Sequence, residues 1–205
     1  MSVGRAILRS MTNNEHKAVL HRYLSSAREN LRWKLAGLSE YDARRPLTPT
    51  GTNLLGLLKH SATAAYGYFG ETFARPYEDG LPWMANGGTD NGDMWATADE
   101  SWEFIVGLYQ RAWGHADATI EALDLDAPGR VPWWPDERAD VTLQAIMVHM
   151  LAETQRHAGH ADIVRESIDG AAGLSAGRSN PPDADAAWWE QYRAGIEDAA
   201  RQVAD

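Results

Sequence analysis

The sequence predicts an all-α fold: a four-helix bundle with long connecting loops and one extra helix near the C-terminus. Four segments of roughly twenty residues or more repeat apolar side chains at intervals of three and four, the period of a helix face. Between them lie two long segments rich in glycine, proline and polar residues. No segment shows a strand pattern strong enough to predict a sheet. Four helices with two long connections are typical of a bundle.

The first two predicted helices cover residues 15–38 and about 54–73. The apolar stripe of the first helix is Val19, Leu20, Tyr23, Leu24, Ala27, Leu31 and Leu35. The stripe of the second helix is Leu54, Leu57, Leu58, Ser61, Ala64, Ala65 and Tyr68. Between the helices, residues 39–49 contain Pro46 and Pro49, so we expect an irregular connector. Residues 50–53 offer candidates for the N-cap of the second helix.

The two long connections carry four tryptophans that are costly to leave in water. Trp83 and Trp95 lie in residues 74–97, and Trp133 and Trp134 lie in residues 124–140. The third predicted helix, residues 99–123, separates these connections. Long loops with aromatic residues usually pack over an end of the core or over a ligand cavity. We therefore expect these tryptophans to wall a cavity against water.

The fourth predicted helix, residues 142–169, carries a polar stripe within its apolar face. His149, Glu153, His157 and His160 follow one another at intervals of four, four and three, so they project along one side. Two adjacent members can share one cation. His149 and His157, however, are separated by roughly 12 Å of helix rise, too far for one ion. A metal site here needs a further ligand from another helix.

His60 is the only histidine of the second predicted helix. If the second and fourth helices pack together, His60 can meet Glu153 and His157 midway along the bundle. Two histidines and one carboxylate leave coordination positions open, a pattern that suits catalytic zinc and also non-haem iron. The alternative is a polar core in which these three side chains hydrogen-bond to one another, because ion-pair networks imitate functional sites.

Charge and composition narrow the function further. A net charge of −10 and a pI near 5.1 argue against nucleic-acid binding, which needs clustered lysine and arginine. No apolar run is long enough to cross a membrane, and residues 1–12 lack the apolar core of a signal peptide, so we expect a cytoplasmic protein. The chain has no cysteine, which excludes disulfides, thiolate metal ligands and a protein thiol nucleophile.

The C-terminal part reads as a separate unit. We expect a metal-binding bundle over residues 13–170, a linker over 171–182 that is rich in glycine, alanine and serine, and an amphipathic helix within 183–205. Trp188, Trp189, Tyr192 and Ile196 of that helix need a surface to cover. We expect this surface to belong to the bundle or to the partner of a homodimer.

Two segments resemble a known family. LTPTGTNLLGLLKH (residues 47–60) and HMLAETQRHAGHADIVRESIDG (residues 149–170) look like the DinB superfamily of bundle metalloproteins, and more narrowly its actinobacterial subgroup, which includes mycothiol-dependent enzymes. The resemblance covers about residues 15–170. Many members use three histidines, whereas Glu153 stands in place of one of them here, as in the mycothiol-dependent maleylpyruvate isomerases. The resemblance implies that His60, Glu153 and His157 are the metal ligands; His160 replaces a glutamine common in relatives.

The resemblance also implies a reaction. Members of this type are viewed as thiol-dependent transferases or isomerases that use mycothiol, bacillithiol or glutathione. A divalent metal stabilises a bound thiolate, and a chain without cysteine has to take its nucleophile from such a co-substrate. We therefore expect an S-transferase, or a related isomerase, that acts on an electrophilic small molecule. Zinc is the first choice of metal, and nickel, iron and manganese stay open.

For several residues, and for the function itself, the sequence leaves more than one interpretation open. His149 and His160 suit positions that support the ligands or fill the core. Arg156 either binds an anionic thiol or substrate or is solvated. The loop acids Asp79, Asp90 and Asp93 do not have EF-hand spacing and read as solvated. A non-catalytic, stress-related protein that binds a metal or a small ligand is the alternative function. Metal-assisted hydrolysis is weaker, because only His149 or His160 is in range as a base.

Overall fold

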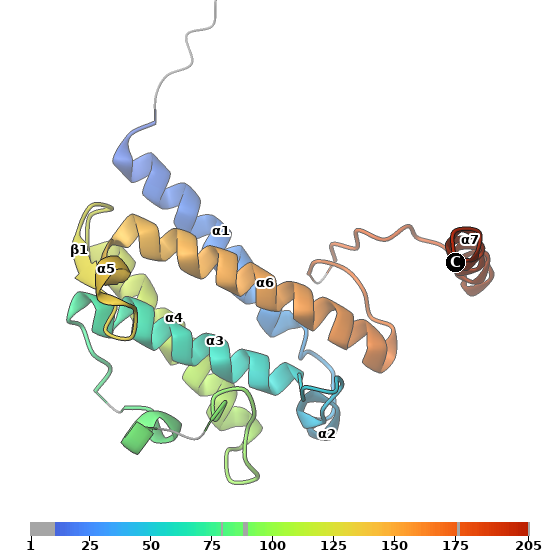
Figure 1. The fold of residues 1–205 in the computed structure, drawn as a ribbon, viewed down its shortest axis with the longest axis horizontal. Coiled ribbons are helices and arrows are strands. Elements are labelled where there is room, and N and C mark those ends of the chain that lie inside the picture. The colour runs from blue at the N-terminus through green and yellow to red at the C-terminus, as the bar shows by residue number, and fades with distance from the viewer. Residues whose placement is uncertain (1–10, 79, 88–89, 176, 205) are drawn as a thin grey trace, which may run out of the picture.

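The computed structural model describes residues 11–78, 80–87, 90–175 and 177–204, and it shows a bundle of four long helices (Figure 1). These helices are α1 (Asn13–Trp33), α3 (Leu54–Phe69), α4 (Trp102–Ala122) and α6 (Leu143–Asp169). The predicted all-α fold is confirmed. None of the helices in the described ranges is long and apolar enough to cross a membrane.

Side chains just outside the helices cap their first turns. The Asn53 side chain accepts a hydrogen bond from the Gly56 amide across 2.7 Å, so the cap of α3 lies within the segment that the sequence indicated. At α6 the Thr142 hydroxyl accepts from the Ala145 amide. Gly170 ends α6 with φ of 76°, a left-handed conformation that glycine adopts without steric cost. These caps fix where the helices that carry the polar residues begin and end.

α3 is the central helix of the bundle. It packs against α4 and α6, and α6 packs in turn against α1. The rings of His60 and His157 are 4.7 Å apart, and those of Tyr68 and His149 are 4.6 Å apart. Moving forward along α3 therefore means moving backward along α6, and the two helices are antiparallel. Because α3 has neighbours on most sides, most of its apolar residues are buried, while Ala64 and Tyr68 are partly buried.

The connections are more regular than the sequence suggested. Residues 39–49, expected to be irregular, contain the short helix α2 (Glu40–Arg44). The second long connection holds α5 (Asp136–Ala139) and two short strands, β1 (Pro128–Arg130) and β2 (Asp140–Thr142), which pair antiparallel. Short 3-10 helices cover Glu71–Phe73 and Pro82–Gly87. No strand pattern marks this hairpin in the sequence, because three-residue strands are too short to show alternation.

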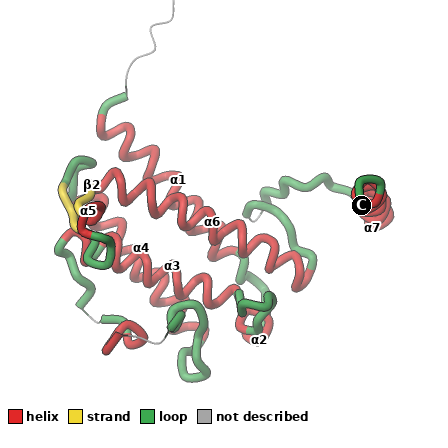
Figure 2. Tube along the Cα trace, viewed as in Figure 1, coloured by secondary structure: helices red, strands yellow, loops and turns green. Residues whose placement is uncertain are grey.

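The C-terminal helix α7 (Ala186–Arg201) follows an extended segment and lies apart from the bundle, as Figures 1 and 2 show. None of its residues is buried. Trp188 and Tyr192 stack on each other with ring centroids 5.1 Å apart, and they are 41% and 51% exposed. In this structure the aromatic residues of α7 are therefore largely open to solvent. Packing of α7 on a partner subunit stays a prediction.

Candidate metal centre

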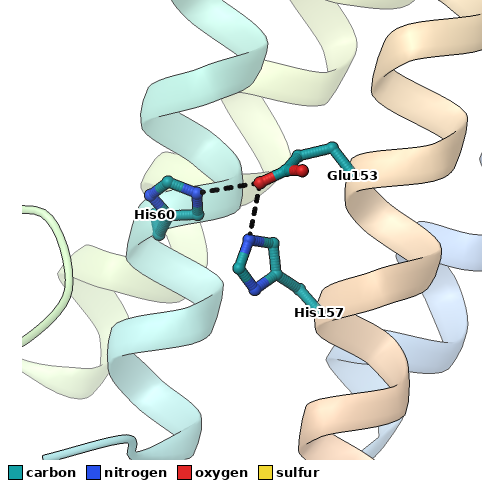
Figure 3. A group of neighbouring side chains, drawn as sticks. All are labelled: His60, Glu153 and His157. Carbon is teal, nitrogen blue, oxygen red and sulfur yellow. Dashed lines mark hydrogen bonds and ion pairs between the residues drawn. The ribbon is translucent and has the colours of Figure 1, made fainter. Parts of the chain in front are cut away.

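Three side chains from two helices converge between α3 and α6 (Figure 3). His60 comes from α3, and Glu153 and His157 come from α6. The Glu153 Oε1 atom is 2.9 Å from Nε2 of His157 and 3.7 Å from Nε2 of His60. One ligand atom of each residue lies within 4.8 Å of the other two. The structure thus brings together the three residues that spacing and resemblance selected. We call them the three-residue cluster.

The helix geometry explains why these side chains meet. Glu153 and His157 are four residues apart, so they lie on the same face of α6. The antiparallel packing of α3 turns His60 toward that face. The three side chains are partly buried, with exposed fractions of 23% for His60, 33% for Glu153 and 11% for His157. Polar groups at this depth need partners, and the cluster supplies one for Nε2 of His157, whereas the buried Nδ1 of that ring has no hydrogen-bond partner among the described residues.

The donor set fits a divalent ion. Zinc binds imidazole nitrogen and carboxylate oxygen at about 2.0–2.2 Å, so two ligands of one ion lie roughly 3–4 Å apart. The separations of 2.9 Å and 3.7 Å in the cluster are close to this range. Three protein donors also leave a coordination position for a small molecule, as in catalytic sites. The cluster therefore allows a divalent metal.

The ionisation of two cluster residues favours metal binding. Burial alone raises the pKa of the Glu153 carboxyl, but the hydrogen bond and charge of His157 bring that pKa below its ordinary value. Burial, together with the charge of His60, lowers the pKa of His157. Near neutral pH Glu153 is therefore an anion and His157 is a neutral imidazole. These are the forms in which both side chains bind metal ions.

Asp93 supports the cluster from the loop before α4. Its Oδ2 atom accepts a hydrogen bond from Nδ1 of His60 across 2.7 Å. This hydrogen bond lowers the pKa of Asp93 and outweighs burial, so the carboxylate is ionised. Nδ1 of His60 is then the protonated nitrogen, and Nε2 faces Glu153. A carboxylate behind a metal-binding histidine commonly fixes the tautomer and the ring orientation in this way.

The expectation that the loop acids are solvated was wrong for Asp93. Asp90 of the same loop is exposed, whereas Asp93 turns inward; Asp79 lies outside the described residues. No periodicity in a loop distinguishes one acid from the other. The only available signal was the polar stripe itself, because a histidine ligand needs a partner for its second nitrogen.

Lys59 holds the loop that carries Asp93. Its side chain is 1% exposed. Its Nζ atom donates to the carbonyl oxygens of Gly92 at 2.8 Å and Trp95 at 3.0 Å. It also donates to both carboxylate oxygens of Glu100, at 2.9 Å and 2.8 Å. The backbone is therefore fixed on both sides of Asp93 by one buried ammonium group.

The comparison with known families covers nearly all of the bundle. The model of the mycothiol-S-transferase family matches residues 19–170, which include the whole three-residue cluster. The chain belongs to the mycothiol-S-transferase family. The resemblance to the DinB superfamily is confirmed, because this family is DinB-like. A search of curated proteins found no match. The linker and α7 lie outside the matched residues.

In this mycothiol-S-transferase family member, His149 does not join the cluster. It lies one turn before Glu153 on α6, and its ring packs against aromatic side chains instead. The ring centroids are 4.6 Å from Tyr68 and 5.2 Å from Trp134. Burial lowers the pKa of His149, so its imidazole is neutral near pH 7. His149 therefore forms part of an aromatic group beside the cluster.

The other two predicted residues of α6 are exposed. The His160 ring packs edge-on against that of His157, with centroids 5.5 Å apart, but the rest of the residue faces solvent. Arg156 is exposed and lies outside the cluster. A role for either residue in supporting a ligand or binding substrate stays a prediction.

A cavity of about 360 Å³ adjoins His60, and of the four loop tryptophans Trp133 lines it. Trp83 is buried instead, with Nε1 donating to the Thr63 hydroxyl across 3.1 Å. Trp95 is 50% exposed, and Trp134 packs on His149. The expected wall of four tryptophans is thus reduced to one. Loop composition could not decide which indole turns toward the cavity.

Proposed function

We propose that this protein is a divalent-metal-dependent S-transferase that joins mycothiol to an electrophilic small molecule. The observation that carries this proposal is the convergence of His60, Glu153 and His157 between two helices of a mycothiol-S-transferase family bundle. Zinc is the proposed ion because two histidines and one carboxylate with an open position suit it. Nickel, iron and manganese accept the same donors.

The chemistry follows from what the chain contains and lacks. A bound divalent ion would stabilise the thiolate form of the co-substrate, which is the nucleophilic form. The chain has no cysteine, so the reacting sulfur comes from the co-substrate. In the transfer the S–H bond breaks, and the sulfur forms a bond to the electrophilic carbon. The proton is released to solvent, and the electron pair displaced from that carbon leaves with the departing group or, in an addition, takes up a proton.

The residues of the chain position these groups. Glu153 and His157 are held in one register by the helix turn that separates them, and Asp93 orients His60. The partial burial of the cluster limits competing water around the reacting sulfur. The adjoining cavity gives the second substrate a place next to the cluster. Geometry of this kind lowers the entropic part of the barrier by holding both reactants together.

Two alternatives have support of their own. A thiol-dependent isomerase would use the same cluster, and the histidine–glutamate–histidine set resembles that of the mycothiol-dependent isomerases. A non-catalytic metal-binding or ligand-binding protein is the second alternative. In its favour, the 2.9 Å hydrogen bond between Glu153 and His157 gives the Glu153 carboxylate and Nε2 of His157 a partner without an ion.

The first test is elemental analysis of the purified protein beside the variant His60→Ala. We expect about one divalent ion per chain in the wild type and none in the variant, because two ligands four residues apart on one helix bind far more weakly than three. If the wild-type protein still contains no metal after reconstitution with zinc, nickel, iron or manganese, the proposal is wrong.

The second test measures thiol transfer. Mycothiol, bacillithiol and glutathione are each incubated with a chromogenic electrophile and the metal-loaded protein. We expect mycothiol to be conjugated fastest, and we expect the rate to fall to the uncatalysed level in His60→Ala. A metal-loaded protein that conjugates none of the three thiols and isomerises no thiol adduct would favour the binding protein.

A further inference from the structure

The cavity beside the cluster is a continuous space with one end at the proposed reaction site. One end of the lining is formed by His60 and Asp93, whose side chains are 23% and 24% exposed, and the lining continues past Ala64 and Tyr68 to Glu71. Glu71 is exposed and lies at the other end of this row of residues. Cavities that bind small molecules measure about 300–1,000 Å³. At about 360 Å³ this one suits a compact small molecule.

Aromatic and aliphatic side chains form much of the cavity wall, together with the polar residues Thr63, Tyr66 and Tyr77. The Trp133 ring lies over Gly67, where an added Cβ atom would be 2.6 Å from the indole. The rings of Trp133 and Tyr68 meet edge to face with centroids 5.1 Å apart. Leu81 and Met84 of the loop after α3 close the other side. Only a glycine at position 67 lets the indole lie this close to α3, so the aromatic wall depends on it.

The charged side chains that line the cavity are acidic. Asp93 stands at the His60 end and Glu71 at the other end, while no lysine or arginine of the described residues lines the space. The Asp93 carboxylate is already committed to His60. A divalent ion in the cluster would be offset by the carboxylates of Glu153 and Asp93, so an anionic ligand that extends toward Glu71 would meet no net positive charge along the cavity, at a cost in free energy.

We infer that this cavity binds the electrophile and selects an uncharged, largely apolar molecule without a carboxylate or phosphate group. The inference rests on the proposed function, because the thiol partner is what makes the occupant an electrophile. Trp133 and Tyr68 provide flat surfaces on which a conjugated or aromatic group stacks. The reacting carbon lies at the His60 end, and the remainder of the molecule extends toward Glu71.

A binding experiment tests the inference without relying on catalysis. Isothermal titration calorimetry compares methyl cinnamate with cinnamate, which differ in charge but share the ring. We expect the ester to bind the wild type at least about tenfold more tightly than the anion. Equal affinity for the two compounds, or no binding of the ester, would overturn the inference.

Two matched tryptophan variants locate the ligand. Trp133 and Trp95 are 48% and 50% exposed, both lie in loops, and only Trp133 lines the cavity. We expect Trp133→Ala to weaken ester binding roughly three- to tenfold and Trp95→Ala to leave it unchanged. Gly67→Ala, which keeps Trp133 but displaces its ring, should weaken ester binding as well. Equal losses in Trp133→Ala and Trp95→Ala would place the ligand elsewhere and overturn the inference.

The charge argument has its own variant. Glu71→Gln should strengthen cinnamate binding about two- to fivefold and leave the ester unchanged, because an exposed charge contributes modestly. Glu190→Gln on α7 is the control. Mycothiol transfer is scored separately. An ester preference without any transfer would defeat the proposed function and leave the assignment of the cavity intact, whereas transfer with equal binding of both compounds would defeat the assignment alone.

Discussion

Nδ1 of His60 donates a hydrogen bond to Oδ2 of Asp93 across 2.7 Å, which ties the ring that α3 contributes to the three-residue cluster to a residue 33 positions later in the chain. The ring cannot rotate without breaking this bond, so its Nε2 atom stays directed at Glu153. Burial alone would lower the pKa of His60, but the hydrogen bond and charge of Asp93 raise it overall. The same contact thus sets both the direction and the basicity of one proposed ligand.

Removal of this carboxylate should weaken metal binding. We expect Asp93→Ala to lower zinc affinity about 10- to 100-fold, the usual cost of losing the partner of a ligand histidine. Asp93→Asn, which keeps an acceptor oxygen but no charge, should lower zinc affinity by a smaller factor. A competition titration against a chromogenic chelator measures these affinities. Asp90→Ala removes an exposed acid from the same loop and is the control; similar losses in Asp90→Ala and Asp93→Ala would contradict the contact's role.

Lys59 should act on the same site through the loop. Lys59→Met leaves the largely buried Glu100 carboxylate without its partner, which we expect to cost about 3–5 kcal/mol of unfolding free energy. It also frees the carbonyl groups of Gly92 and Trp95, so zinc affinity should fall together with stability. Urea denaturation and the chelator titration measure the two effects.

A double variant separates the two roles of Lys59. Lys59→Met combined with Glu100→Gln removes the uncompensated charge and should recover part of the stability, but not the zinc affinity, because the loop carbonyls remain unbound. Lys17→Met is the control, since Lys17 also donates to carbonyl groups, of Glu121 and Leu123, but at the surface. A zinc affinity unaffected by Lys59→Met would show that the loop is held without this lysine.

The helical part of the site could be predicted because helices are periodic. Glu153 and His157 are four residues apart, and residues at this spacing share one face of a helix. His60 is the only histidine of the helix that packs opposite them. The sequence left the relative direction of these helices open, yet either direction allows a meeting midway along the bundle. The long helices themselves were predictable for the same reason, with ends displaced by a few residues.

The loop-borne part could not be predicted, because loop side chains follow no period. Asp93 and Asp90 are equivalent in the sequence, and the contacts of Lys59 and Asn53 with the neighbouring backbone hold the segment around Asp93. Likewise Trp133 lines the cavity because Gly67 leaves room for its ring. The contacts of Lys59 with the Asp93 loop and of Gly67 with Trp133 join segments that are distant in the sequence. Patterns within one segment cannot predict such contacts.

Metal removal should lower thermal stability if the ion binds the folded state. At a free zinc concentration of about 100 times Kd, the linked stabilisation is roughly 2.7 kcal/mol. For a chain of this size that corresponds to a Tm difference of about 5–11 °C between zinc-loaded and chelator-treated protein. His157→Ala should abolish the difference, and His160→Ala, three residues away and exposed, should keep it. A zinc-dependent Tm in His157→Ala would place the ion elsewhere.

A second ionic group, between α1 and α4, should make stability pH-dependent. Asp117 accepts two hydrogen bonds from Arg28, at 2.7 Å and 2.8 Å, and contacts His21 at 2.7 Å. Burial alone raises the pKa of Asp117, but the Arg28 and His21 contacts hold it below its ordinary value. A carboxylate with a lowered folded-state pKa stabilises the protein above its unfolded pKa of about 3.9, and this contribution is lost as pH falls through the folded pKa.

We therefore expect Asp117→Asn to lower the free energy of unfolding by about 1–2 kcal/mol at pH 7. The expected loss is small because the Asp117 side chain is 35% exposed. The difference from wild type should shrink as pH falls below about 4. Urea denaturation at pH 7, 5 and 3 measures it, with the exposed Asp126→Asn as control. A difference that stays constant down to pH 3 would contradict an origin in the ionised carboxylate.

The C-terminal helix should mediate association and leave the metal site unaffected. Trp188, Tyr192 and Ile196 recur every four residues, so they form one face of α7, and they are 41%, 51% and 55% exposed. An exposed apolar face of this kind marks a surface for another molecule, and a second copy of the chain presents the same face. We expect sedimentation velocity to show a dimer for the full chain and a monomer for the chain ended after Pro182. That truncation retains the contact between Lys34 and Gly173 at the end of the bundle, so its zinc content should match that of the full chain.

Trp188→Ala with Tyr192→Ala should reproduce the monomer, and Glu190→Ala on the opposite side of α7 should not. A full chain that sediments as a monomer at all concentrations would leave α7 without this role.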